Sequence, residues 1–190
     1  TLFRSDAVSA GGTGGLNWHV HALTSGPRWQ ETLSVIDDFL AGLKPRCDHL
    51  VLLGGSAGWM MPPRWLQRFR HIDAYDIDPL APWLFKLRHG RSLQASQTQI
   101  RFHREDAIAG LPAVLQNHPQ ACLWFDNLLG QLRYRLGDEE AAERQLGQLK
   151  HLLRGREWGS LHDMYSGPTD EQTRTVRQPQ ALTQPGILEP

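Results

Sequence analysis

The chain has 190 residues, of which 40% are hydrophobic and 21% charged, and its 20 basic residues balance its 20 acidic ones. This composition is typical of one globular domain, and a net charge of zero gives no general attraction to nucleic acid or to an anionic membrane. No apolar run approaches the roughly 20 residues that a membrane-spanning helix needs, so we expect no membrane partner.

The elements predicted from the sequence begin with a glycine-rich arm. Residues 1–28 are expected to form this arm, with a short helix over 16–23. A longer helix follows, because apolar residues recur at intervals of three and four on one helical face: Leu33, Ile36, Leu40 and Leu43. Pro45 ends that helix. His49–Leu53 is then apolar without alternation, which is typical of a strand buried on both faces.

Helices and strands alternate through the following residues. Further strands are expected over 72–77, 99–103, 121–125 and 158–164. Further helices are expected over 62–70, 79–89, 111–116 and between Asp138, as the cap, and Gly155. The inward-facing residues of the second of these helices are predicted to be Leu80, Leu84 and Leu87. Those of the last are predicted to be Ala142, Leu146, Leu149 and Leu153.

The alternation of helices and strands predicts a parallel sheet with helices on both faces. We therefore expect one doubly wound α/β domain over residues 1–165. Residues 166–190 are rich in proline, glutamine and threonine and are expected to form an irregular tail, without an evident antiparallel hairpin.

The two cysteines, Cys47 and Cys122, both border apolar runs. Free cysteine behaves as a small hydrophobic residue, so we expect two separate buried thiols. With no signal peptide and no disulfide framework in the sequence, a cytoplasmic location is expected.

Small and polar residues follow the predicted strands, and ligands bind to doubly wound sheets at the carboxyl ends of their strands. In strand order they are Gly54, Gly55, Ser56, Ala57 and Gly58; Asp76, Ile77 and Asp78; Glu105, Asp106 and Ala107; Asp126 and Asn127; His162 and Asp163. Asp76 lies 18 residues beyond Gly58, which is the spacing at which a carboxylate accepts the hydroxyls of a ribose. Asp106 and Ala107 are placed to read an adenine amino group. The strand ends therefore predict a pocket for adenosine.

This pattern resembles the class I S-adenosylmethionine-dependent methyltransferases over about residues 50–163. The resemblance implies a Rossmann-like domain with strand order 3-2-1-4-5 and S-adenosylmethionine as the cofactor. It implies that the glycine loop lies under the methionine part, that Asp76 binds the ribose and that Asp106 and Ala107 contact the adenine. The cofactor-binding residues implied in this way are Gly54, Gly55, Ser56, Gly58, Asp76, Ile77, Asp106, Ala107, Asp126 and Asn127.

The resemblance also bears on the reacting groups. It places the end of the fourth strand, with Asp126 and Asn127, beside the reactive methyl group and the acceptor. A base is needed only where the acceptor must lose a proton, and Asp126, His162 and Asp163 are the candidates. The chain departs from the family at Leu52, where an acidic residue is common, and at Ser56, where the middle glycine stands.

The acceptor is expected to be a small molecule or a protein. Methyltransferases that act on amino groups of nucleic acids often carry an Asn/Asp-Pro-Pro-aromatic motif after the fourth strand, and residues 126–129 read Asp-Asn-Leu-Leu. Together with the zero net charge, this does not favour nucleic acid as a partner. The oligomeric state is left open, with a dimer as one option.

Three alternative functions remain open at this point. Residues 54–58 fit the G-x-S-x-G motif, and Ser56, Asp126 and His162 follow one another in the order of a serine hydrolase. The same pocket also suits an aminopropyltransferase, which uses a decarboxylated relative of the cofactor. A non-catalytic protein that binds an adenosine cofactor is the third.

No metal site is predicted. Asp73, Asp76 and Asp78 lack the spacing and the glycine of a calcium-binding loop, and His19 and His21 have no evident partner pair.

Overall fold

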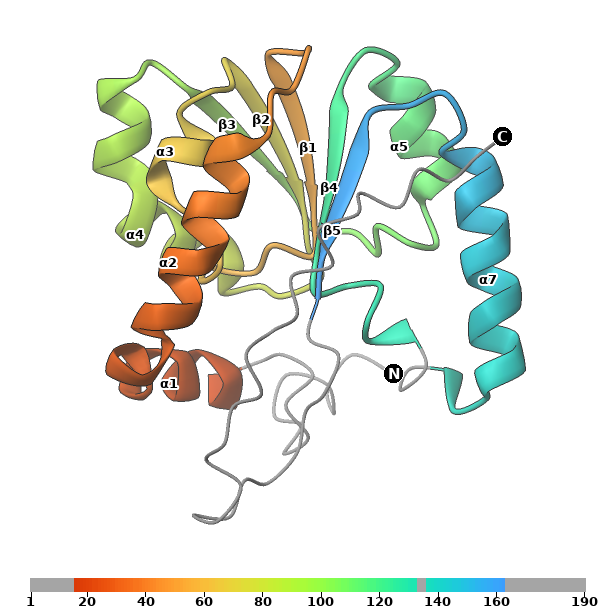
Figure 1. Cartoon of the computed structure of the whole chain (residues 1–190), viewed down its shortest axis with the longest axis horizontal. Helices are drawn as coiled ribbons and strands as arrows, with labels where there is room; N and C mark the ends of the chain where they lie inside the picture. Colours follow the sequence, from red (N-terminus) through yellow and green to blue (C-terminus); the bar gives the residue numbers. More distant parts are fainter. Residues whose placement is uncertain (1–15, 133–135, 163–190) are drawn as a thin grey trace.

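The computed structural model describes residues 16–132 and 136–162 of the chain (Figure 1). Its centre is a parallel sheet with the order β3-β2-β1-β4-β5. The strands are β1 His49–Leu53, β2 His71–Tyr75, β3 Gln99–His103, β4 Cys122–Asp126 and β5 Trp158–Leu161. The predicted α/β, Rossmann-like architecture and the predicted strand order are therefore confirmed.

Helices lie on both faces of the sheet (Figure 1). One face is covered by α2 Gly26–Gly42, α3 Pro63–Leu66 and α4 Ala81–Ala95, and the other by α5 Leu111–Asn117 and α7 Glu139–Leu152. Helix α1 Leu16–Thr24 lies beside the carboxyl ends of the strands, below α2 and α4, red at the lower left of Figure 1. The predicted arm thus contributes a helix to the edge where ligands of such sheets bind.

The central strand β1 explains the two-faced core. Leu50 and Leu52 pack with the first group of helices, whereas Val51 and Leu53 pack with the second. Burial of one such side chain contributes about 1.5–3 kcal/mol to stability. A strand without polar positions therefore has to lie at the centre of the sheet, where both faces are covered.

Helix α7 follows the prediction closely. The Asp138 side chain accepts a hydrogen bond from the Glu140 backbone N–H at 3.0 Å and so caps the first turn. Ala142, Leu149 and Leu153 are buried, and Gly155 takes up a left-handed conformation with φ +75° just beyond the helix. The predicted inner face of this helix is therefore confirmed at these positions.

The predicted inner face of α4 is wrong. Leu80 and Leu87 are exposed, the latter at 72%, and the buried residues of α4 are Ala81, Phe85, His89 and Leu93. The helix has two apolar stripes, and packing selects the one that brings Phe85 against Phe102 of β3, with ring centroids 5.6 Å apart.

Several predicted boundaries also shift. β2 ends at Tyr75 and β5 at Leu161, so both are shorter than predicted, and α3 ends at Leu66 rather than at residue 70. β4 is shifted by one residue from the predicted 121–125, so Asp126 is the last residue of that strand instead of the first one after it. Residues 1–15 and the predicted tail over 166–190 lie outside the described residues.

The expectation of two separate thiols is also wrong, because Cys47 and Cys122 form a disulfide with Cα atoms 6.1 Å apart. The sheet brings them together: Leu50 of β1 is the pairing partner of Cys122 in β4, so the segment before β1 lies beside the start of β4. Within the described residues, none of the helices is both long enough and apolar enough to cross a membrane.

Candidate functional site

The loop after β1 turns sharply through Gly54–Gly58 and lies against the end of β4. Gly54 and Gly58 adopt φ angles of +74° and +68°, and Ser56 adopts +46°. A Cβ atom on Gly54 would lie 3.1 Å from the backbone oxygen of Asp126, so glycine permits this close approach. Ser56 has no such freedom, and its left-handed conformation is a local strain of the kind found at functional sites.

Asp76 holds this loop against the end of β2. Its Oδ2 atom accepts a hydrogen bond from the Ser56 N–H at 2.7 Å, and its Oδ1 atom accepts one from the Asp78 N–H at 2.8 Å. Burial raises the pKa of Asp76, and these two backbone hydrogen bonds oppose that effect. Each carboxylate oxygen has a second lone pair, so Asp76 can still accept hydroxyl groups. Ile77 beside it is 53% exposed and offers an apolar surface.

Asp126 and Asn127 lie at the end of β4. Asp126 is 5% exposed, and burial, followed by repulsion from Asp76, raises its pKa to about 8. Asn127 adopts a left-handed conformation with φ +53°, and its N–H donates to the Leu161 oxygen at 2.6 Å. This site therefore holds a neutral carboxyl group at pH 7 beside a second strained residue.

Three polar atoms of this edge lack hydrogen-bond partners within residues 16–132 and 136–162. They are Ser56 Oγ, Asp126 Oδ1 and Asn127 Oδ1, all of which are buried. A buried polar atom without a partner costs about 1–3 kcal/mol. A concentration of such atoms on two adjacent strand ends is what a site for a polar ligand requires.

Asp106 follows β3 and closes the turn that leads toward α5. Its Oδ1 atom accepts hydrogen bonds from the N–H groups of Ile108 at 3.0 Å and Ala109 at 3.3 Å. Ala107 is buried beneath this turn. The Asp76 N–H donates to the His103 oxygen at 3.0 Å, which ties the ends of β2 and β3 together. The two loops predicted to contact ribose and adenine are thus neighbours.

The predicted catalytic residues are not all brought together. His162 is exposed beyond β5, and its Nδ1 atom lies 3.3 Å from Ser160 Oγ. Asp163 lies outside the described residues. Because Ser56 Oγ has no hydrogen-bond partner in the described part of the chain, the serine–histidine contact of a hydrolase is not formed there.

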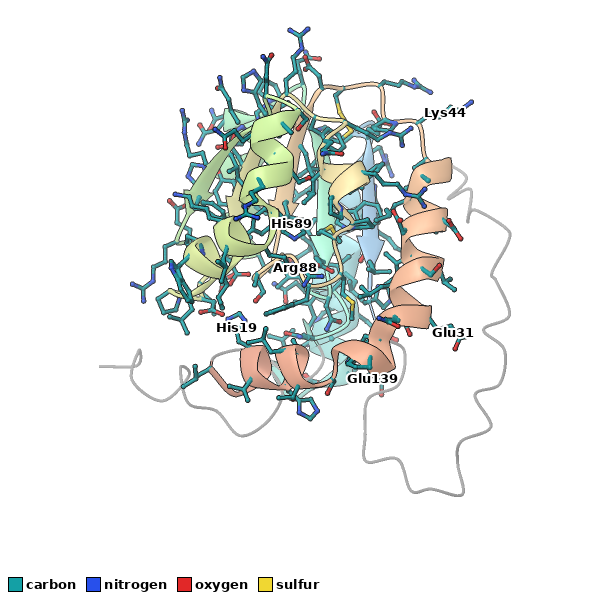
Figure 2. All side chains as sticks on the ribbon, turned by 90° about the vertical axis from the view of Figure 1, so that its left-hand side faces the viewer. His19, Glu31, Lys44, Arg88, His89 and Glu139 are labelled. Carbon is teal, nitrogen blue, oxygen red and sulfur yellow. A yellow bond between two sulfur atoms is a disulfide. The ribbon has the colours of Figure 1, made fainter. Side chains whose placement is uncertain are left out.

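Helix α1 adds contacts that the sequence did not predict. His19 is 2% exposed, and its Nε2–H group donates to Asp78 Oδ2 at 2.6 Å, while its Nδ1 atom accepts from Trp59 Nε1 at 3.1 Å. The Arg88 guanidinium lies over the Trp59 ring, 5.0 Å from its centroid. Figure 2 shows His19 rising from α1 toward Arg88 and His89 of α4. No local spacing joins residues so far apart in sequence, so only the fold reveals this contact.

His89 of α4 packs against the glycine loop and donates a hydrogen bond to it. Its ring Nε2 donates to the Gly58 oxygen at 3.0 Å, and burial lowers its pKa to about 4, so the ring is neutral at pH 7. A Cβ atom on Gly58 would lie 2.7 Å from the His89 ring. The close contact therefore requires glycine at this position as well.

Two cavities flank the site. One of about 60 Å³ lies between α1, α2 and Trp59, and Trp29, Leu33 and Arg88 also line it. The other, of about 290 Å³, lies beside α5 and is lined by Tyr75, His103, Glu105 and His118, among others. Neither cavity is lined by Ser56, Asp76 or Asp126.

No family model, curated protein or solved structure matches this sequence. The fold and the geometry of the carboxyl edge therefore carry the functional argument.

Proposed function

We propose that the protein binds S-adenosylmethionine at the carboxyl edge of the sheet and transfers its methyl group to a small molecule or to a protein. One observation carries this proposal: the strained glycine loop, the Asp76 carboxylate and the unpartnered atoms of Ser56, Asp126 and Asn127 meet at the ends of adjacent strands. An adenosine linked to a charged amino acid has hydroxyl, amine and carboxylate groups that such atoms can bind.

The residues present fit this cofactor. Asp76 would accept the ribose hydroxyls with its remaining lone pairs, and Ile77 would pack against the adenine. Asp126 Oδ1 and Asn127 Oδ1 are acceptors for an ammonium group, and Ser56 Oγ can donate to a carboxylate. Asp106 and Ala107 stand on the neighbouring loop, where the resemblance puts the adenine.

S-adenosylmethionine supplies a methyl group that its sulfonium already activates. The protein therefore has to hold donor and acceptor in line and exclude water. Where the acceptor must lose a proton, Asp126 supports the role of base better than His162 does. With a pKa of about 8, the Asp126 carboxyl group is mostly protonated at pH 7, and its ionised fraction, which grows toward pH 8, would accept the proton, whereas His162 is exposed.

The test is a calorimetric titration of the full chain with S-adenosylmethionine and with S-adenosylhomocysteine. We expect one-to-one binding by the wild type. Asp76→Asn should weaken it about 10- to 100-fold, because a hydrogen bond to a charged group contributes about 1.5–3 kcal/mol. Asp48→Asn is the matched control, since Asp48 is an exposed carboxylate before β1.

Failure of the wild type to bind either compound, or equal affinity in Asp76→Asn, would refute the assignment. A thermal melt of each variant shows whether the loss comes from unfolding instead. Tight binding without methyl transfer to any acceptor would favour a non-catalytic cofactor-binding protein. Preference for the decarboxylated cofactor would favour an aminopropyltransferase, and covalent labelling of Ser56 by a fluorophosphonate would favour a hydrolase.

A further inference from the structure

Three histidines surround one aspartate on the sheet face that α5 covers. His49 opens β1, Asp73 lies in the middle of β2, His103 ends β3 and His118 directly follows α5. Side chains alternate along a strand, so His71, Asp73 and Tyr75 of β2 point to the same face. His49 pairs with His71 and His103 pairs with Tyr75, so both histidines lie on the same face as Asp73.

The nitrogen and oxygen atoms of this group lie close together. His49 Nε2 is 2.8 Å from Asp73 Oδ2, and His103 Nε2 is 2.6 Å from Asp73 Oδ1. His118 Nδ1 is 3.9 Å from Asp73 Oδ2, which is too far for a hydrogen bond. The ligand-type atoms of His49, Asp73 and His118 all lie within 4.8 Å of one another.

Of the three imidazoles, only that of His118 makes no hydrogen bond to the Asp73 carboxylate. His49 and His103 each donate to Asp73, whereas the inward Nδ1 atom of His118 stays at 3.9 Å. On its other side, His118 Nε2 lies 2.8 Å from the Tyr75 hydroxyl. When Nε2 donates to that hydroxyl, the Nδ1 lone pair points into the cluster. This arrangement is typical of metal-binding histidines, whose second nitrogen is fixed by a neighbouring oxygen.

The distances agree with a bound transition metal. Ligand atoms about 2.0–2.2 Å from a tetrahedral zinc ion lie about 3.3–3.6 Å from one another. The separations of 2.8 and 3.9 Å from Asp73 Oδ2 lie on either side of this value. A shift of about half an ångström in each histidine would bring both into place around one ion.

We propose that His49, Asp73 and His118 bind a zinc-type divalent transition metal, while His103 keeps its hydrogen bond to the other carboxylate oxygen of Asp73. Imidazole nitrogens with one carboxylate suit zinc and similar ions, whereas magnesium and calcium prefer oxygen ligands throughout. The cluster is separate from the proposed cofactor site, so neither proposal depends on the other.

The residues around the cluster hold the proposed metal ligands in place, and a cavity beside them gives access from solvent. The Asp73 and His118 side chains are 9% and 11% exposed, so water does not surround them. The Tyr75 ring stacks on His103 at a centroid distance of 4.3 Å. The cavity of about 290 Å³ is lined by Tyr75, His103 and His118, so it gives access to the cluster from the side of His118.

The test is titration of the chelator-treated full chain with Zn²⁺ and, separately, with Co²⁺ under non-reducing conditions. We expect one equivalent of Zn²⁺ to bind and to raise the melting temperature. Co²⁺ should give the visible absorption of a tetrahedral site with nitrogen and oxygen ligands. Asp73→Asn and His118→Gln should each weaken Zn²⁺ binding at least about 100-fold.

Two further variants make the result decisive. His49→Gln changes a partly exposed ligand and should also weaken binding while the fold is kept, as circular dichroism will check. His151→Gln alters an exposed histidine on α7 and should leave binding unchanged.

Cys47, Cys122 and Glu157 form a second group of ligand-type residues. A thiolate-to-cobalt charge-transfer band, no stoichiometric Zn²⁺ binding, or full affinity in a folded Asp73→Asn variant would overturn the proposal.

Discussion

Asp126 ends a strand that is buried on both sides, and burial raises its pKa from 3.8 to about 8. In the unfolded chain this carboxyl group is ionised above about pH 4, whereas in the fold it stays protonated up to about pH 8. Folding therefore takes up a proton between these values. Its contribution to stability is full below pH 4 and is lost as the pH rises toward 8.

We expect the free energy of unfolding to fall with rising pH by about 1.4 kcal/mol per unit from this group. Asp126→Asn, which does not titrate, should remove that fall. The histidines, including His89 with its pKa of about 4 in the fold, are the same in wild type and variant, so the difference between their slopes from about pH 6.5 to 8 isolates Asp126. Urea unfolding across this interval measures it, and identical slopes for wild type and variant would contradict it.

At the scale of elements, α1 depends on its tertiary contacts. A helix of 9 residues is too short to be stable alone, and His19 joins it to Asp78 and Trp59. Replacing His19 by Ala removes a buried hydrogen bond to a charged group, which contributes about 1.5–3 kcal/mol. Hydrogen exchange over residues 16–24 should become about 10- to 100-fold faster.

The control for this experiment is His21→Ala, which changes an exposed histidine of the same helix. It should leave the exchange rates of α1 nearly unchanged. If His19→Ala also leaves them unchanged, the contact with Asp78 does not hold the helix on the edge.

Helices and strands were predictable where the hydrophobic pattern of the sequence fits only one arrangement. β1 and β3 have the predicted bounds, because a short apolar or alternating run between turn residues fits a strand alone. The inner face of α4 was not predictable, since Leu80, Leu84 and Leu87 form a stripe as regular as the one that is buried. The choice depends on Phe102 and Gly58, which belong to other elements.

At the scale of the whole molecule, the disulfide joins two halves of the sheet across a sequence separation of 75 residues. In the chain-entropy description, closing a loop of this length stabilises the fold by about 4 kcal/mol. Reduction should lower the free energy of unfolding toward that extent. Urea titrations with and without a thiol reductant measure the change.

Alkylation of the unfolded, unreduced chain followed by mass spectrometry tests directly whether the disulfide is present. No added alkyl group is expected before reduction, and two are expected after it. Two groups before reduction would mean that Cys47 and Cys122 are free thiols in solution, as the sequence alone had suggested.

The sequence predicted the carboxyl edge better than the sheet face. Gly54, Asp76 and Asp126 follow or end three strands that are neighbours in the sheet, and the rule that parallel strands end at one edge brings them together without further information. The cluster around Asp73 had no such rule. Its histidines come from β1, β3 and the end of α5, and only strand register and the packing of α5 make them neighbours.

The strand order has a consequence for synthesis on the ribosome. β1, β2 and β3 are consecutive in the chain and adjacent in the sheet, so they can pair while later residues are still being added. β4, which covers the other edge of β1, is made only afterwards. Until then the nascent chain presents an apolar strand with one open edge, which is the kind of surface that other chains join. Once β4 is in place, its own outer edge stays open until β5 pairs with it, so the demand for a chaperone should persist until residue 161 has emerged.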